Sequence, residues 1–435
     1  MHHNLPLDCP IRIVSLKVTD VRFPTSEGSH GSDAIHPDPD YSAAYVELTT
    51  SEAGLKGCGS AFTLGRGTEV IAKNIESLKH YVEDKKLESI VNNFRNFYHA
   101  LVNDGQMRWL GPEKGVLHMA CSAILNAIWD LWAKVAGKPV WKLLSDMRPQ
   151  QLVDLIDFTY ISDYLTPDEA LQILAEDGKE NDREGYLNAN GYPAYTTSAG
   201  WLGYSEQTIR EQHALLSSQG FDKFKVKVGQ NLESDRARLR LLRELCGPQG
   251  VLMTDANQRW SVPEAVAWMR QLAEFQPYWI EEPTSPDDML GHRAVRDALQ
   301  PLGVRVATGE MCQNKVLFKQ FFQAAALDVC QIDACRLASV NEVLPVLLMA
   351  AKAGVPVCPH AGGLGLCEYV QHYIMFDYIR VSRSLQDRMC EYSSHLHEHF
   401  VHPVRMKNGA YLPPEDAGFN TEMLATSVEQ AEFKK

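Results

Sequence analysis

The chain has 435 residues, 45% of them hydrophobic and 22% charged, which is typical of a soluble globular protein with more than one domain. Its formal net charge of −13 argues against a nucleic-acid-binding surface. The most apolar stretch, residues 343–351, is too short to cross a bilayer, so we expect neither a nucleic-acid nor a membrane partner.

The N-terminus and the cysteines indicate the compartment. Residues 1–10 have neither a basic start followed by an apolar core nor an Arg-rich amphipathic pattern, so no presequence is expected. The ten cysteines are scattered without a Cys-x-x-Cys pair, which favours reduced, buried thiols over a disulfide framework or a zinc site. We expect an intracellular protein, with the cytoplasm favoured over the mitochondrion, that is compatible with a homo-oligomer.

The N-terminal part predicts an α+β domain over residues 1–150. Residues 11–23, 42–50 and 55–62 are rich in Val, Ile, Tyr and Thr and predict an antiparallel meander. The polar loop between the first two, residues 24–41, is either a disordered connection or a functional loop. Helical periodicity follows over residues 68–101 and 116–136, and Gly137 and Pro139 end the second stretch.

The following part of the chain repeats one pattern, an apolar run that ends in a polar residue. Successive polar residues are 23 to 31 residues apart, about one strand-plus-helix unit. Helix-like stretches lie between the runs, so the sequence predicts a (β/α) barrel over residues 151–403 and a tail, 404–435, that returns to the N-terminal domain. The polar residues are Lys227, Asp255, Glu281, Glu310, Asp333, His360 and Glu391.

The first barrel strand has two candidates. Residues 152–160 are apolar enough to form it, whereas residues 194–198 restore the repeat spacing to the strand that contains Lys225. The sequence does not decide between them.

Three of the acids predict a metal site. The carboxyl ends of barrel strands meet at one mouth, so Asp255, Glu281 and Glu310 can offer oxygen ligands to a single divalent cation, with Mg²⁺ the natural candidate. Without a cation these carboxylates would repel one another. The alternative is that each is a separate helix cap or ion-pair partner.

The remaining polar residues predict acid–base chemistry beside the cation. Lys225 and Lys227 alternate with apolar residues and so share one face of their strand. The charge of Lys225 should lower the pKa of Lys227, which would make its amine a usable base. His360, oriented by Asp333, would stand opposite, unless it is an ordinary turn histidine. Glu391 is either an ion-pair partner or, if protonated, a donor to a developing enolate.

This chemistry suits removal of a proton α to a carboxylate. If the substrate also carries a 3-hydroxyl, a protonated imidazole can assist its departure, and the net reaction is loss of water. The same pair could instead racemise the α-carbon, and a site retained only for binding or regulation is an alternative of another class. The alternating histidines of residues 394–399 are interpreted as surface or supporting residues rather than as a metal site.

The motifs at residues 224–229, 254–260, 279–288 and 359–368 resemble the enolase superfamily, mandelate-racemase subgroup. Within it the chain is most similar to the L-fuconate dehydratase family, and the resemblance covers nearly the whole length. It implies an α/β fold: a modified TIM barrel, (β/α)7β, with an α+β capping domain formed by the N-terminal segment and the C-terminal tail. It also implies Mg²⁺ as cofactor and a small sugar acid as substrate.

The resemblance further assigns roles. The implied reaction is the conversion of L-fuconate to 2-keto-3-deoxy-L-fuconate and water, and the loop at residues 29–41 would fold over the barrel mouth. The implied residues are Lys227 as base, His360 as acid partner with Asp333 behind it, Asp255, Glu281 and Glu310 as magnesium ligands, and Gly31, Tyr41, Lys225, Asn257 and Glu391 as substrate contacts.

Overall fold

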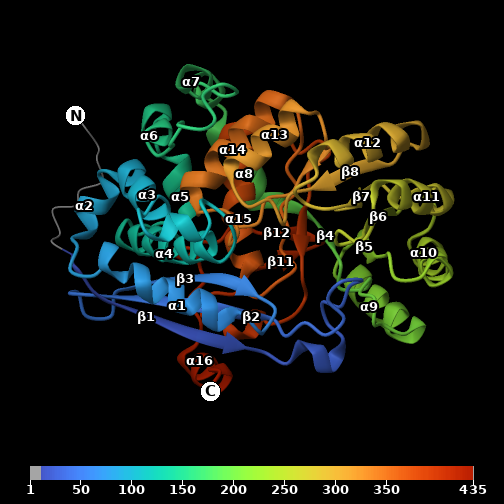
Figure 1. Cartoon of the computed structure of the whole chain (residues 1–435), viewed down its shortest axis with the longest axis horizontal. Coiled ribbons are helices and arrows are strands. Elements are labelled where there is room, and N and C mark those ends of the chain that lie inside the picture. Colours follow the sequence, from blue (N-terminus) through green and yellow to red (C-terminus); the bar gives the residue numbers. More distant parts are fainter. Residues whose placement is uncertain (1–10, 435) are drawn as a thin grey trace.

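The computed structural model describes residues 11–434 and begins with a three-stranded sheet (Figure 1). Its strands, β1 (Ile13–Arg22), β2 (Ser42–Thr50) and β3 (Lys56–Thr63), pair antiparallel in chain order, which confirms the predicted meander. The N-terminal segment for which we expected no presequence lies outside the described residues.

Five helices follow the sheet, of which the first and the fourth pack on it and the others pack against the fourth. They are α1 (Thr68–Leu78), α2 (Leu87–Val91), α3 (Phe94–Val102), α4 (Gly115–Val135) and α5 (Val140–Ser145). The helix α4 packs closely on β3, because a Cβ atom on Gly59 would lie 2.3 Å from the carbonyl oxygen of Ala123. By length and composition α4 is the one described helix that could cross a membrane, but 94% of its apolar window is buried, as in a core helix.

The larger part of the chain is a parallel barrel. Neighbouring strands pair in chain order, and β10 pairs with β4 to close the ring. The position between β9 and β10 is filled by residues near Val357, which form a parallel bridge with Cys330. The strands are β4 (Tyr192–Thr196), β5 (Lys223–Lys227), β6 (Val251–Asp255), β7 (Trp279–Glu281), β8 (Arg305–Thr308), β9 (Val329–Cys330) and β10 (Cys390–Tyr392).

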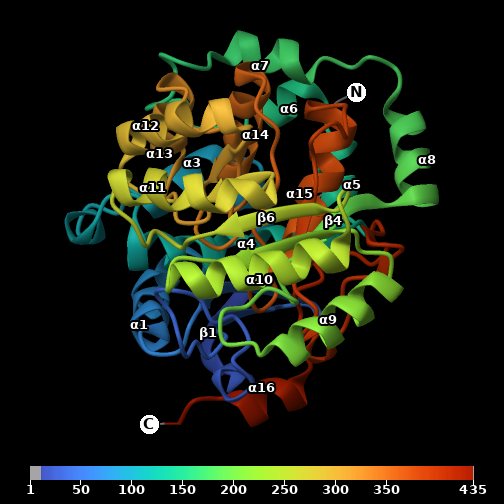
Figure 2. The same ribbon diagram turned by 90° about the vertical axis from the view of Figure 1, so that its right-hand side faces the viewer.

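Seven helices alternate with these strand positions and surround the barrel, which gives the predicted (β/α)7β order (Figure 2). They are α9 (Glu206–Ser218), α10 (Leu232–Cys246), α11 (Val262–Leu272), α12 (Met289–Leu299), α13 (Lys315–Gln323), α14 (Val340–Ala353) and α15 (Leu366–Phe376). Short 3-10 segments are η1 (Thr25–Gly28), η2 (Lys79–Tyr81), η3 (Met107–Leu110), η4 (Ala273–Phe275), η5 (Gln300–Leu302) and η7 (His397–His399), and η6 (Asp377–Val381) is π-helical.

The first barrel strand is β4, so the candidate at residues 194–198 was the better of the two. The other candidate, residues 152–160, contains the end of α6 (Pro149–Val153) and a turn in which the side chain of Asp157 accepts a hydrogen bond from the backbone N–H of Thr159. A side chain that bonds the backbone two residues on favours a turn over a strand. The helices α7 (Pro167–Leu174) and α8 (Glu180–Asn190) then lead to β4.

The C-terminal tail returns to the capping domain, as predicted. A hairpin of β11 (Met406–Lys407) and β12 (Ala410–Tyr411) pairs antiparallel with β4, and α16 (Ala425–Ala431) lies against β1. The backbone N–H of Phe433 donates to the carbonyl oxygen of Asp20 at 2.8 Å. The nine cysteines within residues 11–434 are free thiols, mostly buried, as expected. The domain boundaries at residues 150 and 403 stay predictions.

Candidate active site

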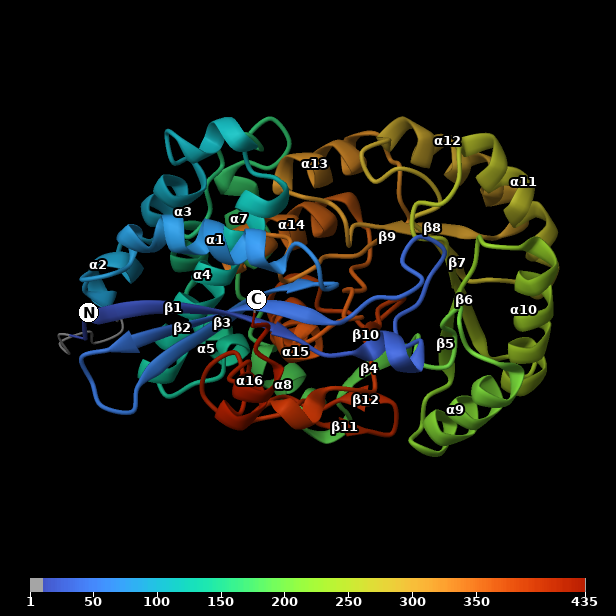
Figure 3. The ribbon, with the colours of Figure 1, turned by 60° about the horizontal axis from the view of Figure 1, so that its bottom comes forward.

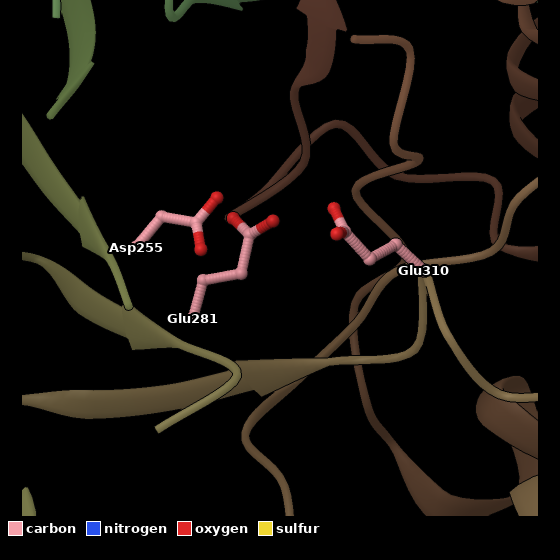
Figure 4. Close-up of side chains that lie close together, drawn as sticks. All are labelled: Asp255, Glu281 and Glu310. Atoms are coloured by element: carbon pink, nitrogen blue, oxygen red, sulfur yellow. The ribbon is translucent and has the colours of Figure 1, made fainter. Parts of the chain in front are cut away.

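The three acids predicted to bind a metal converge at the barrel mouth. Asp255 and Glu281 end neighbouring strands and are paired in register, while Glu310 follows β8 by two residues. Figure 4 shows the three carboxylates facing one another. One oxygen from each lies within 4.8 Å of the other two, close enough for the three to hold one cation between them. Three carboxylates are a donor set that fits Mg²⁺.

Lys225 lies among these carboxylates. Its Nζ is 2.9 Å from both carboxyl oxygens of Glu281, 3.3 Å from Oδ2 of Asp255 and 3.0 Å from Oε1 of Glu391, and its side chain is fully buried. Although burial opposes the charge of Glu391, Lys225 and His360 hold its pKa below the usual range. The ion-pair interpretation of Glu391 therefore describes this structure, in which the carboxyl is ionised.

Lys227 flanks the Asp255 end of the triad. Its Nζ donates to Oδ2 of Asp255 at 2.6 Å and to Oδ1 of Asn257 at 3.0 Å. Burial lowers the pKa of Lys227 and Lys225 adds to that effect, but the charges of Asp255, Glu310 and Asp33 together raise the pKa above its usual value. Lys225 does act to lower this pKa, as expected, but the implied net lowering was wrong because it left out the neighbouring carboxylates.

His360 flanks the other end. Its Nδ1 is 2.8 Å from Oδ2 of Asp333, so the predicted pair is in contact, and its Nε2 lies 3.5 Å from Glu310 and 3.9 Å from Glu391. Burial lowers the pKa of His360, but the charge of Glu310 and the hydrogen bond to Asp333 raise it to about 9. The imidazole is therefore protonated at neutral pH. An amine and an imidazolium thus stand at opposite ends of the carboxylate group.

The loop between β1 and β2 is ordered and lies beside β4 and the barrel mouth (Figure 3). The Oγ of Ser32 accepts a hydrogen bond from the backbone N–H of Gly203 at 2.9 Å, which ties the loop to the segment after β4. Gly31 has φ +79°, and a Cβ there would lie 2.4 Å from the hydroxyl oxygen of Tyr41. Tyr41 is buried and interacts electrostatically with Lys227, so the loop reaches the site.

Sequence reasoning missed several residues of this loop. His36 and Asp33 form a pair at 2.9 Å, and Asp33 acts electrostatically on Lys227. His30 belongs to an aromatic cluster with Trp201, Tyr204, Tyr41 and His395. His395 is one of the alternating histidines of residues 394–399, so this segment also contributes a side chain to the mouth. The signal available in the sequence was the concentration of His and Asp in a loop without periodicity.

The other two histidines of residues 394–399 contact polar side chains of neighbouring segments. His397 contacts Oε1 of Glu368 at 2.7 Å, and His399 contacts the hydroxyl of Ser427 at 3.0 Å. The interpretation of these histidines as supporting residues rather than as a metal site stays a prediction.

Two family models match the chain, one in the capping domain and one in the barrel. "Mandelate racemase / muconate lactonizing enzyme, N-terminal domain" matches residues 34–145, and "Enolase C-terminal domain-like" matches residues 207–427. The chain belongs to the mandelate racemase and muconate lactonizing enzyme group of the enolase superfamily. Its capping domain and its barrel each correspond to one of the two domains of that group.

Several members of this superfamily are similar to this chain over nearly its full length. Mitochondrial enolase superfamily member 1 of Homo sapiens is 58% identical over 97% of this chain and 96% of its own length, and its crystal structure superposes with a TM-score of 0.96. L-galactonate dehydratase of Hypocrea jecorina is 51% identical over 97% of this chain and 94% of its own length. L-talarate/galactarate dehydratase of Salmonella typhimurium, crystallised with Mg, is 22% identical with a TM-score of 0.76 over 100% of this chain and 96% of its own, and shares the fold.

Proposed function

We propose that the protein is a Mg²⁺-dependent sugar-acid dehydratase that converts L-fuconate to 2-keto-3-deoxy-L-fuconate and water. The observation that carries this proposal is the placement of Lys227 and His360 at opposite ends of the carboxylate triad. Relatives at 51% and 28% identity carry the names of sugar-acid dehydratases, which supports the same reaction class.

The proposed steps follow from the side chains. When bound at Asp255, Glu281 and Glu310, Mg²⁺ balances the carboxylate charges and acts as a Lewis acid toward the substrate carboxylate. Neutral Lys227 takes the proton from C2, and the electron pair left behind forms the C2–C3 double bond as the C3–O bond breaks. His360 gives its Nε2 proton to the departing hydroxyl, which leaves as water. The enol that remains tautomerises to the 2-keto-3-deoxy acid.

The choice of L-fuconate rests on the aromatic cluster around His30. L-fuconate differs from L-galactonate only at C6, where a methyl group replaces a hydroxymethyl group. We place this far end of the substrate against His30, Trp201, Tyr204 and His395. Burial lowers the pKa of His395 to about 3, so its ring is neutral and the cluster offers aromatic faces. An apolar wall favours the methyl group.

L-galactonate is the second candidate. The Nε2 atom of His395 is buried without a hydrogen-bond partner among the described residues, and a substrate hydroxyl could satisfy it. A relative at 51% identity is named for that activity.

The test is to incubate the purified protein and Mg²⁺ with L-fuconate, L-galactonate, arabinonate, galactarate and L-talarate. We expect a 2-keto-3-deoxy product from L-fuconate, with kcat/KM about tenfold above that for L-galactonate. Inversion at C2 without loss of water would make the protein a racemase, and a higher kcat/KM for L-galactonate would identify the second candidate. Lys227→Ala serves as the control, because equal turnover by this variant would refute the assigned base.

Compartment and assembly stay predictions. An intracellular location is retained, and relatives at 58% to 60% identity carry "mitochondrial" in their names. Fractionation of cells that express the tagged protein would distinguish the mitochondrion from the cytoplasm.

A further inference from the structure

The buried helix α4 carries polar residues on one side. His118, Ser122 and Asn126 are spaced by four, which places them along the same side of the helix, and each is at most 1% exposed. A polar group buried on an apolar helix is costly unless it has a hydrogen-bond partner. Their partners belong to the barrel: Ser122 and Asn126 bond the segment between β9 and α14, and His118 contacts Glu342 in the first turn of α14.

Two of these residues hold backbone carbonyl groups. The hydroxyl of Ser122 donates to the carbonyl oxygen of Leu337 at 2.7 Å, and Nδ2 of Asn126 donates to the carbonyl oxygen of Ala334 at 3.2 Å. These carbonyls belong to an irregular segment without a ladder of its own. The carbonyl of Leu337 also accepts from the backbone N–H of Ser339 at 2.8 Å, whereas the carbonyl of Ala334 has its donors on α4. The capping domain therefore supplies hydrogen bonds that the barrel lacks at this point.

The third residue acts on the end of the same segment. Nε2 of His118 lies 2.5 Å from Oε2 of Glu342, and that carboxylate also accepts a hydrogen bond from the backbone N–H of Ala338 at 2.8 Å. Ser339, the next residue, has φ +59°, a conformation that a non-glycine residue adopts only when its surroundings impose it.

The segment fixed in this way begins at the partner of His360. Oδ1 of Asp333 accepts from the backbone N–H groups of Cys335 at 2.8 Å and Arg336 at 2.7 Å, which leaves Oδ2 to contact the imidazole at 2.8 Å. Nε of Arg336 also donates to the carbonyl oxygen of Glu310 at 3.0 Å. One short segment thus orients both the imidazole and a metal ligand.

We propose that Ser122 and Asn126 of the capping domain are positioning residues for the reaction: by holding residues 334–337 they aim Asp333 at His360. The inference rests on the proposed function. Without the hydroxyl of Ser122, the carbonyl of Leu337 keeps only the backbone N–H of Ser339 as a donor, the carbonyl of Ala334 also loses a donor, and the segment relaxes. A displacement of about 1 Å at a reacting group can lower turnover by up to about 100-fold.

The test compares Ser122→Ala with Cys121→Ala. Cys121 is the neighbouring residue on α4, is equally buried, and directs its Sγ to the carbonyl oxygen of Leu101 within the capping domain, 3.7 Å away. We expect Ser122→Ala to lower kcat by about 10- to 100-fold with KM changed less than about threefold, and Cys121→Ala to retain kcat. In crystal structures of the two variants, the separation of Asp333 Oδ2 and His360 Nδ1 should exceed about 3.5 Å in Ser122→Ala only.

Three outcomes would overturn the proposal: an unchanged separation in Ser122→Ala, a lengthened separation with wild-type kcat, or the same loss of kcat in both variants. If Ser122→Ala is insoluble, Asn126→Leu disturbs the same segment at similar side-chain size and is judged by the same criteria. Failure of the proposed function would show as an inactive wild type, whereas the crystallographic separations test the positioning without any substrate.

Discussion

Magnesium binding should release a proton, because the pKa of one of its ligands is raised in the free protein. Burial and the negative charge of Asp255 raise the pKa of Glu281 to about 8, although Lys225 acts in the opposite direction. A carboxyl group with a raised pKa keeps its proton up to that pH, and coordination requires the ionised form. Adding Mg²⁺ below pH 8 must therefore displace the proton from Glu281.

The size of the effect follows from this pKa. At pH 7, one unit below it, about 90% of Glu281 is protonated, so about 0.9 proton should leave per cation bound, and at pH 6 about 1.0. Since the proton competes with the cation, the apparent Kd for Mg²⁺ should weaken about tenfold between pH 7 and pH 6. Any release beyond one proton would come from Lys227, which must lose its own proton to act as a base, or from His360, whose pKa the charge of Glu310 raises.

Isothermal titration calorimetry in buffers of different ionisation enthalpy measures the number of protons directly. The Lys227→Met variant is the control, since it keeps Glu281 but has no amine, and the difference from wild type gives the contribution of Lys227. A release below about 0.3 proton at pH 7, or the same Kd at pH 6 and pH 7, would refute the reasoning.

Two further predictions concern the imidazole and the loop. The charges of Glu310, Glu391 and Asp333 and the hydrogen bond to Asp333 raise the pKa of His360 to about 9 against the effect of burial. Asp333→Asn removes one of these charges, so the alkaline limb of the kcat profile should move to lower pH by about one unit, and an unmoved limb would contradict the role of the pair. Gly31→Ala should raise KM about tenfold, because the new Cβ would displace Tyr41. Gly54→Ala is its control, as it has the same positive φ in open space, and a matching rise in KM there would show a general loss of stability instead.

The barrel and most of its polar residues could be predicted because two regularities survive in the sequence. Side chains alternate along a strand, which placed Lys225 and Lys227 on one face, and the strand-plus-helix length placed each acid at the end of its strand. The same spacing identified Glu310, although this residue follows the end of β8 by two positions and Gly309 before it has φ +139°. The sequence left two candidates for the first barrel strand, because β4 has only five residues and was supported by the spacing alone.

The loop and the charges could not be predicted in the same way. Residues 24–41 have no periodicity, and their partners near Gly203 are some 170 residues away, so nothing local indicates where His30, Asp33 and His36 lie. The prediction of a lowered pKa for Lys227 failed for a related reason. Strand alternation identifies its neighbour on the same strand, Lys225, but the stronger influence comes from Asp255 on the next strand.

The charge arrangement also answers why three converging acids are compatible with a stable fold. Sequence reasoning treated a cation as a necessity, because the carboxylates alone would repel one another. In the structure, the ammonium group of Lys225 contacts Asp255, Glu281 and Glu391 together, and Lys227 balances Asp255 from the other side. The two lysines therefore hold the ligands in place before a cation binds. A cation held at Asp255 would take over this carboxylate from the ammonium group of Lys227, and the exchange would free the amine that the proposed reaction needs as its base.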